Sequence, residues 1–153
     1  MSDGPKRIPL PDEGAIFRLA SQVVQSLAPG SLLVLSGPLG SGKTTLVKSL
    51  ARALGSAADV TSPTYALVHE YPTPSGTLAH LDAYRLPSAT VLFDLGLSEL
   101  QERSRLTVVE WGEALIEHEP TAYHLALDRS GDPSEALHGA LWRSWPGRSP
   151  AER

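Results

Sequence analysis

Apolar side chains recur with helical spacing in two stretches of the chain. The first begins at Pro11-Asp12-Glu13 and ends at Ala28-Pro29-Gly30, and the second runs from Lys43 to about Leu54, where Gly55 stops it. The pattern therefore predicts two amphipathic helices, each with one face packed on a sheet. The positions expected to face inward are Ile16, Leu19, Ala20, Val23, Val24 and Leu27 in the first helix and Leu46, Val47, Leu50 and Leu54 in the second.

Several shorter runs have the composition and spacing of strands. Residues 106–109 form a continuous β-prone run, typical of a strand covered on both faces in a parallel sheet, and residues 31–36 surround a similar apolar run. Residues 123–127 and 136–142 are expected to add two strands, and Ile8-Pro9-Leu10 is expected to be extended. The predicted strands therefore lie before, between and after the two predicted helices along the chain.

Residues 65–71 and 77–82 predict two more strands, paired as a hairpin across residues 72–76. Alternation in the second strand divides its side chains between two faces. One face carries Leu78, His80 and Asp82, and the other carries Thr77, Ala79 and Leu81.

The strand at 31–36 leads into a glycine-rich segment with the spacing G-x-x-x-x-G-K-[ST]. Glycines let consecutive backbone N–H groups curl around phosphate oxygens without Cβ clashes, and the following helix presents its positive end there. A strand before this spacing and a helix after it predict a nucleoside triphosphate site. The residues expected to bind the nucleotide are Gly37, Pro38, Leu39, Gly40, Ser41, Gly42, Lys43, Thr44 and Thr45.

Two side chains of this segment have separate expected roles. Lys43 supplies a mobile positive charge for the β- and γ-phosphates, and the Thr44 hydroxyl is placed to bind Mg²⁺. The sequence therefore predicts a triphosphate bound together with a divalent cation.

Composition narrows the function classes. A chain of 153 residues with 41% hydrophobic content suits one domain and leaves no room for a separate substrate domain. Cysteine is absent, which excludes disulfides and thiolate metal sites. A formal charge of −4 argues against strong autonomous binding of a nucleic-acid backbone. Without a signal-like or membrane-spanning run, we expect a cytoplasmic protein with no membrane or DNA partner.

The elements together predict the α/β class. We expect a single P-loop NTPase domain over residues 1–145, with a mixed, mostly parallel sheet flanked by helices. Residues 146–153 combine Pro, Gly and Ser with charged ends, and are expected to form a disordered tail.

Two acidic residues end predicted strands, where ligands of open α/β sheets bind. Glu110 ends the run 106–109, and its carboxylate is costly there unless it pairs with a metal or cation; otherwise it is a helix-start residue or a salt-bridge partner. Asp82 either binds Mg²⁺ through water, orients the attacking water, or forms a structural ion pair with Arg85.

Other candidates are more ambiguous. Ser62-Pro63-Thr64 either reaches the γ-phosphate and changes shape on hydrolysis, or starts a strand with local capping. Trp111 either shields the site or packs in the core. The histidines lack metal-ligand spacing and are assigned no catalytic role; they are His69, His80, His118, His124 and His138.

Five motifs in order resemble the TsaE (YjeE) family, the small P-loop ATPases of bacterial tRNA threonylcarbamoyladenosine synthesis. The likeness covers roughly residues 8–128. The motifs are Ile8-Pro9-Leu10-Pro11-Asp12-Glu13, the phosphate loop from Gly37 to Thr45, Thr61-Ser62-Pro63-Thr64-Tyr65, His80-Leu81-Asp82-Ala83-Tyr84-Arg85-Leu86 and Val109-Glu110-Trp111.

The resemblance implies specific roles. Thr44 and Glu110 would hold Mg²⁺, Asp82 would support hydrolysis, and residues 62–64 would form a switch-like segment. The chain would bind the TsaD transferase and its TsaB companion, and ATP hydrolysis would keep that complex turning over. The modified adenosine adjoins the tRNA anticodon, and tRNA would be engaged indirectly, through the complex.

Some positions depart from the family pattern. Ile16 stands where the family commonly has a Thr near the base, Pro38 replaces an acidic or polar residue, and Ala83 replaces a bulkier apolar one. Other classes compare less well: a small-molecule kinase normally needs an Arg-bearing lid, and a GTPase switch needs Asn-Lys-x-Asp, which is absent. A nucleotide-binding module that never hydrolyses stays open.

Overall fold

The computed structural model describes residues 6–10, 12–37, 43–56, 68–82, 96–110, 122–128 and 139–142. Within these ranges a seven-stranded sheet has the order β1-β7-β6-β2-β5-β4-β3. Its strands are β1 (Lys6–Pro9), β2 (Ser31–Ser36), β3 (Val68–Tyr71), β4 (Leu78–Asp82), β5 (Leu106–Glu110), β6 (Tyr123–Asp128) and β7 (Gly139–Trp142). The central strands β6, β2, β5 and β4 are parallel, and β7 and β3 run the other way. The mixed, mostly parallel α/β sheet predicted from the sequence is confirmed.

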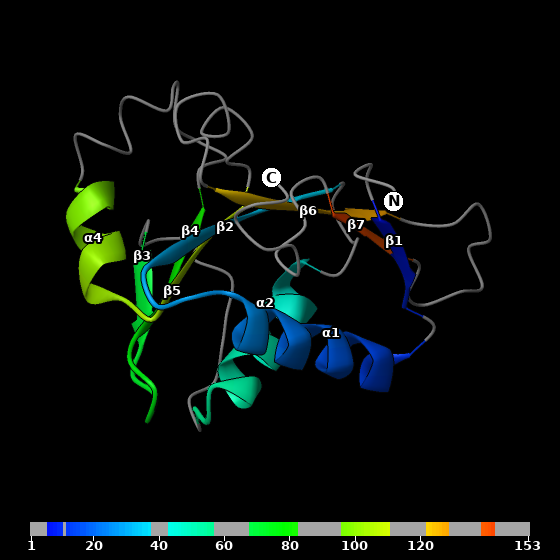
Figure 1. Cartoon of the computed structure of the whole chain (residues 1–153), viewed down its shortest axis with the longest axis horizontal. Helices are drawn as coiled ribbons and strands as arrows, with labels where there is room; N and C mark the ends of the chain where they lie inside the picture. Colours follow the sequence, from blue (N-terminus) through cyan, green and yellow to red (C-terminus); the bar gives the residue numbers. More distant parts are fainter. Residues whose placement is uncertain are drawn as a thin grey trace.

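Two apolar clusters cover the two faces of this sheet. Helices α1 (Glu13–Ser26) and α2 (Lys43–Ala53) lie on one face, as Figure 1 shows, and pack on Leu33, Leu35 and Val108. Helix α4 (Leu97–Arg103) lies on the other face and packs with Leu32, Val34 and Val109. Because β2 and β5 are buried on both faces, they read as continuous apolar runs in the sequence.

Helix α1 begins where its capping signal predicts. Asp12 is the N-cap, and its Oδ1 accepts a hydrogen bond from the backbone N–H of Ala15 at 2.7 Å. Glu13 adds a negative charge in the first turn, where the helix dipole favours it. All inward positions predicted for α1 are buried except Val24, which is partly buried.

Helix α2 ends at the predicted glycine. Beyond Ala53, Ser56 N–H donates to the carbonyl of Ala51 at 2.9 Å, and Gly55 N–H donates to that of Arg52 at 3.0 Å. This pair of bonds is the Schellman arrangement, which satisfies the last carbonyls of a helix. The four predicted inward residues of α2, Leu46, Val47, Leu50 and Leu54, are all buried.

The predicted hairpin is also confirmed. Strands β3 and β4 pair antiparallel, and Thr73 shapes the turn by accepting from Ser75 N–H at 3.1 Å and donating to the Gly76 carbonyl at 2.5 Å. Alternation along β4 is as predicted, since Leu78 belongs to the α1/α2 core while Ala79 and Leu81 belong to the α4 core.

At the amino ends of the central strands, Arg105 joins three segments. Its backbone N–H donates to the Thr77 carbonyl at 2.8 Å, and its carbonyl accepts from Gly30 N–H at 3.2 Å. Its Nη2 donates to the Val24 carbonyl at 2.7 Å. The starts of β2, β4 and β5 are therefore tied to α1 by hydrogen bonds that mostly use the backbone.

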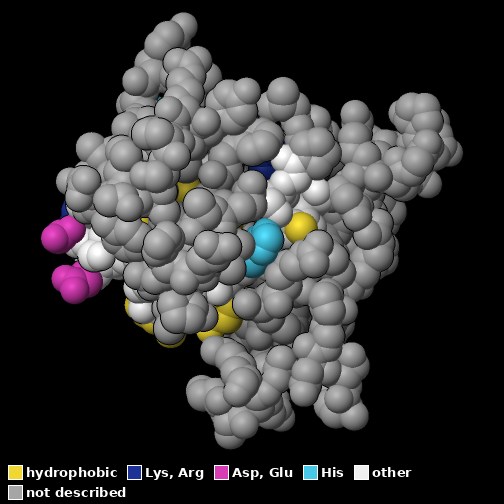
Figure 2. Space-filling view, turned by 90° about the horizontal axis from the view of Figure 1, so that it is seen from above, with side chains coloured by type: hydrophobic (Ala, Val, Ile, Leu, Met, Phe, Trp, Pro, Cys, Tyr) yellow, Lys and Arg dark blue, Asp and Glu magenta, His cyan; other side chains and the backbone are white. Residues whose placement is uncertain are grey.

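Helix α4 is the element that the sequence pattern did not predict. It has two buried residues, Leu97 and Leu100, and its N-cap, Gly96, makes no side-chain capping bond. Figure 2 shows acidic side chains at the α4 edge of the molecule, where Glu99 and Glu102 are exposed.

No helix in the described ranges is both long enough and apolar enough to cross a bilayer. The predicted strand residues 65–67 and 136–138 and the tail 146–153 lie outside the described residues.

Candidate functional site

The phosphate-loop motif joins the carboxyl end of β2 to the first turn of α2. Strand β2 ends at Ser36, and Gly37 follows with a φ of 141°, a backbone conformation that favours glycine. Helix α2 begins at Lys43. The strand and the helix that the motif requires are both present. The loop residues Pro38, Leu39, Gly40, Ser41 and Gly42 lie outside the described residues, so their contacts stay predictions.

Lys43 closes this loop on itself. Its Nζ donates to the carbonyl of Gly37 at 2.5 Å, which joins the lysine of the motif to its first glycine. The side chain is only 6% exposed, and a buried ammonium is costly unless hydrogen bonds and negative charge surround it. Lys43 is therefore held at the loop, where a phosphate would supply that charge.

The first turn of α2 also suits an anion. It contains no acidic residue, so the positive end of the helix dipole is not offset there by a carboxylate. Thr44 and Thr45 occupy this turn and are both partly exposed. Thr44 therefore lies beside Lys43 in the part of the loop that the sequence assigned to Mg²⁺.

The two predicted carboxylates lie opposite each other at the carboxyl ends of adjacent strands. Glu110 is the last residue of β5, opposite Leu35 on β2, and Asp82 is the last residue of β4, opposite Glu110. Adjacent strands are about 4.8 Å apart. Asp82 and Glu110 share the face that carries α1 and α2, because they alternate with residues of the α4 core. Glu110 therefore lies on the strand next to β2, which leads into the loop, and Asp82 lies one strand further away on the same side.

This arrangement places like charges side by side. Glu110 is 4% exposed and Asp82 is partly buried. Neighbouring carboxylates repel, and a cation between or beside them relieves the repulsion. The described residues contain no group of three or more His, Cys, Asp or Glu side chains placed to hold a metal ion. A nucleotide-bound Mg²⁺ usually takes one or two carboxylates and completes its shell with phosphate oxygens and water.

His80 is a member of this site that the sequence analysis did not assign. It is fully buried on β4, and its Nε2 donates to Oε2 of Glu110 at 2.5 Å. Glu110 is thus both a strand-end carboxylate and the hydrogen-bond acceptor of a buried histidine. A signal for His80 was present, because alternation in β4 put it on the same face as Asp82. The sequence pattern does not show how β4 aligns with β5, and the contact between His80 and Glu110 depends on that register.

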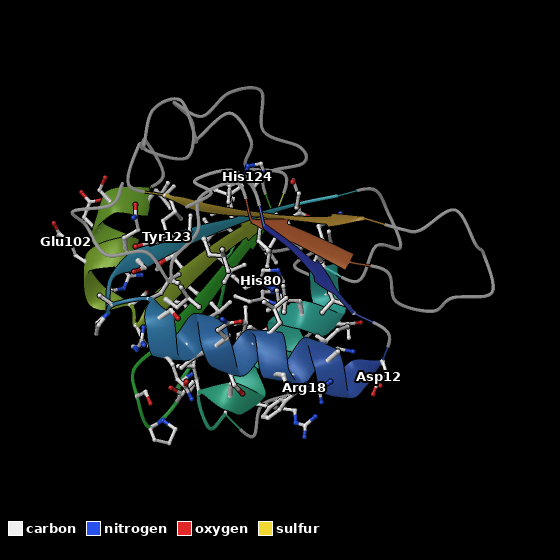
Figure 3. All side chains as sticks on the ribbon, turned by 45° about the vertical axis from the view of Figure 1, so that its right-hand side comes forward. Asp12, Arg18, His80, Glu102, Tyr123 and His124 are labelled. Atoms are coloured by element: carbon white, nitrogen blue, oxygen red, sulfur yellow. The ribbon has the colours of Figure 1, made fainter. Side chains whose placement is uncertain are left out.

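A second histidine lies near the loop on the other side of the sheet. Nε2 of His124, on β6, is 2.7 Å from the hydroxyl of Ser36, the residue before Gly37. Figure 3 shows His80 on the helix side of the sheet and His124 on the opposite side. The Ser36–His124 contact therefore joins the carboxyl end of β2 to β6 on the face opposite Glu110 and Asp82.

The remaining predicted residues divide into two groups. Ile16 is 2% exposed in the α1 core, so at this position the chain uses an apolar side chain for packing. Others lie outside the described residues, and their predicted roles stay predictions: Ser62, Pro63, Thr64, Ala83, Arg85 and Trp111.

Comparisons with known proteins point to one family. The family described as "Threonylcarbamoyl adenosine biosynthesis protein TsaE" matches residues 10–136. A relative from Treponema pallidum named "tRNA threonylcarbamoyladenosine biosynthesis protein TsaE" is 41% identical, over 67% of this chain and 76% of its own. Proteins of the same name from Aquifex aeolicus and Bacillus subtilis are 41% and 37% identical, each over 71% of this chain and over 77% and 68% of their own.

A solved structure extends the likeness to the fold. The crystal structure of Bacillus subtilis YdiB superposes with a TM-score of 0.69 at 26% identity, covering 90% of this chain and 84% of that one. The shared fold is an α/β P-loop nucleotide-binding fold. Family, relatives and fold together show that the chain belongs to the TsaE family of tRNA threonylcarbamoyladenosine biosynthesis proteins.

Proposed function

We propose that this protein is a Mg²⁺-dependent ATP hydrolase that drives turnover of a TsaB–TsaD complex in threonylcarbamoyl modification of tRNA. One observation carries the proposal most directly. In the register of β2, β5 and β4, Glu110 lies opposite Leu35 on the strand that enters the phosphate loop, and Asp82 lies opposite Glu110 on the next strand. Membership of the TsaE family supplies the modification pathway.

The residues present fit a bound Mg²⁺. The Thr44 hydroxyl and the Glu110 carboxylate are hard oxygen donors of the kind this ion prefers, and the paired acidic side chains favour a cation. When bound, Mg²⁺ neutralises phosphate charge and polarises the transferring phosphoryl group.

Each functional side chain then has a defined task. Lys43 binds the β- and γ-phosphates, exchanging the Gly37 carbonyl for phosphate oxygens. Glu110 holds the cation. Asp82 orients the water that attacks the γ-phosphorus. The new bond to the water oxygen forms as the bond to the β–γ bridging oxygen breaks, which gives inorganic phosphate and ADP and releases a proton of the water to solvent. Positioning and charge stabilisation account for nearly all of this chemistry, because a phosphoryl transfer needs little covalent help from the protein.

Partner proteins are expected to complete the site. In other P-loop enzymes an activating residue supplied in trans raises the rate by about 10³–10⁵-fold. We propose that TsaB and TsaD together supply or order the missing element, and that tRNA is engaged only through them. The segment 62–64 is the proposed switch that responds. The proposed setting is the cytoplasm, with residues 1–145 acting as one ATPase domain.

The test is steady-state phosphate release at fixed ATP and Mg²⁺, with the protein alone and with the purified complex. We expect slow release alone and stimulation that needs both partners. Asp82→Ala is the control and should lose the stimulated rate. Rapid release in isolation, unchanged by the partners, would point to an independent NTPase, and no release under any condition would point to a non-hydrolysing nucleotide-binding module.

A further inference from the structure

His80 is a buried polar residue between the hydrophobic core and the carboxylates that end β4 and β5. Its side chain has no exposed surface, and it lies on the α1/α2 face of β4 between Leu78 and Asp82, opposite Val108 of β5. Leu78 and Val108 belong to the hydrophobic core. The ring therefore lies where the apolar core meets the two carboxylates.

Within the described residues, this ring is hydrogen-bonded to the carboxylate of Glu110. A carboxylate oxygen accepts, so His80 donates through Nε2 to Oε2. Nδ1 of the same ring is buried, and within the described residues it has no hydrogen-bond partner. A buried unpaired ring nitrogen costs free energy, and buried polar pairs can often be replaced by apolar residues without loss of stability. Stability is thus a weak reason for a histidine here.

We infer that His80 is the positioning residue of Glu110. By fixing Oε2, it restricts rotation of the carboxylate at the end of β5 and leaves Oε1 for the cation. Side chains that orient a metal ligand commonly change metal affinity by about 10–100-fold when they are removed. This inference rests on the proposed function, because it assumes that Glu110 holds the nucleotide-bound Mg²⁺.

A purely structural role for His80 makes a different prediction. If the pair only stabilised the sheet, replacing His80 would lower the thermal midpoint and leave the Mg²⁺ dependence of nucleotide binding unchanged in folded protein. A positioning role links the ring to the cation. The substitution should then weaken the Mg²⁺-dependent part of binding and spare the part measured in EDTA.

Four substitutions separate these roles. His80→Leu removes the donor and keeps an apolar side chain, while His80→Asn keeps an amide that is too short to reach Glu110. His80→Gln restores a donor at about the distance of Nε2. The matched control is His69→Leu, because His69 lies opposite His80 on β3 and its Nδ1 contacts the Tyr71 hydroxyl at 3.0 Å rather than the site.

The experiment titrates Mg²⁺ into full-length protein with a fluorescent ATP analogue, below the thermal midpoint of every variant. We expect His80→Leu and His80→Asn to raise the half-saturating Mg²⁺ concentration by about 10–100-fold. Affinity in EDTA should not change. His80→Gln should recover most of the loss, and His69→Leu should match wild type. If His80→Leu does not fold, His80→Asn and His80→Gln carry the comparison.

Glu110→Gln distinguishes failure of the inference from failure of the proposed function. If Glu110→Gln responds to Mg²⁺ as wild type does, Glu110 is not the cation ligand and the proposed function needs another. If Glu110→Gln loses the response while the folded His80→Leu or His80→Asn variant keeps it, the positioning role of His80 is wrong. Equal loss in His80→Gln and His80→Asn would also overturn it, since the restored donor would have had no effect.

Discussion

The two ends of the central strands are held together in different ways. At the amino ends, Arg105 is bonded to Thr77 and Gly30 through backbone groups alone, and its guanidinium adds one bond to the Val24 carbonyl. At the carboxyl ends the named contacts belong to charged or titratable side chains, Lys43 with Gly37 and His80 with Glu110. Bonds between backbone groups, such as those of Arg105 with Thr77 and Gly30, depend little on side-chain identity, whereas both contacts at the carboxyl ends depend on it.

This difference separates stability from function. A buried ammonium and a buried carboxylate are costly to keep at the carboxyl ends, and an apolar edge would avoid that cost. Binding of oppositely charged ligands, phosphates at Lys43 and a cation at Glu110, would offset the cost of burying these two side chains. We therefore expect changes at the carboxyl ends to affect nucleotide binding, and changes at the amino ends to affect folding.

The largest effect is expected for Lys43→Ala. The substitution removes the cation that faces the phosphates, and hydrogen bonds to charged groups contribute about 1.5–3 kcal/mol each. ATP affinity measured by calorimetry should fall about 100-fold, since about 1.4 kcal/mol corresponds to a factor of ten. The matched control is Lys48→Ala, which removes an exposed lysine from the same helix and should bind ATP as wild type does. Undiminished affinity in folded Lys43→Ala would refute the role of the loop.

For Gly76→Ala, at the amino ends of the strands, we expect a smaller effect, and we expect it on stability rather than on ATP affinity. Gly76 has a φ of 122°, and an added Cβ would lie 3.0 Å from Cβ of Arg105. Strained backbone of this kind costs about 1–3 kcal/mol, so the free energy of unfolding in urea should fall by that amount. ATP affinity should stay within about two-fold, which is the scatter expected for independent sites.

Ser75→Ala is the control for Gly76→Ala, because Ser75 is exposed in the same turn. We expect it to change the free energy of unfolding by less than about 0.5 kcal/mol. A large loss of ATP affinity in Gly76→Ala, with stability unchanged, would mean that the two ends are not separable.

The sequence predicted most of the fold because its signals are local. The Asp12 cap, Gly55 after α2 and the apolar periods of α1 and α2 each depend on residues within a few positions of one another. Helix α4 escaped prediction for the same reason. Its seven residues bury only Leu97 and Leu100, and Gly96 provides no side-chain cap. Packing on the sheet, rather than a local signal, accounts for this helix.

The site was predictable as a set of residues but not as an arrangement. Glu110 and Asp82 were identifiable from their places at strand ends, and Lys43 from the loop motif. Their adjacency depends on β5 lying between β2 and β4, which is a long-range pairing that no local pattern encodes. The bond from His80 to Glu110 requires the same register, and this is why His80 was first assigned no role.

The most direct test of the central claim is to locate bound nucleotide on the wild-type protein. Amide chemical shifts of ¹⁵N-labelled protein would be followed while ATP and Mg²⁺ are added. The account predicts large, saturable changes at Gly37, Lys43 and Glu110, and small changes at Gly30, Gly76 and Arg105. Changes centred on the amino ends, or none at all, would contradict the assignment of the carboxyl ends as the nucleotide site.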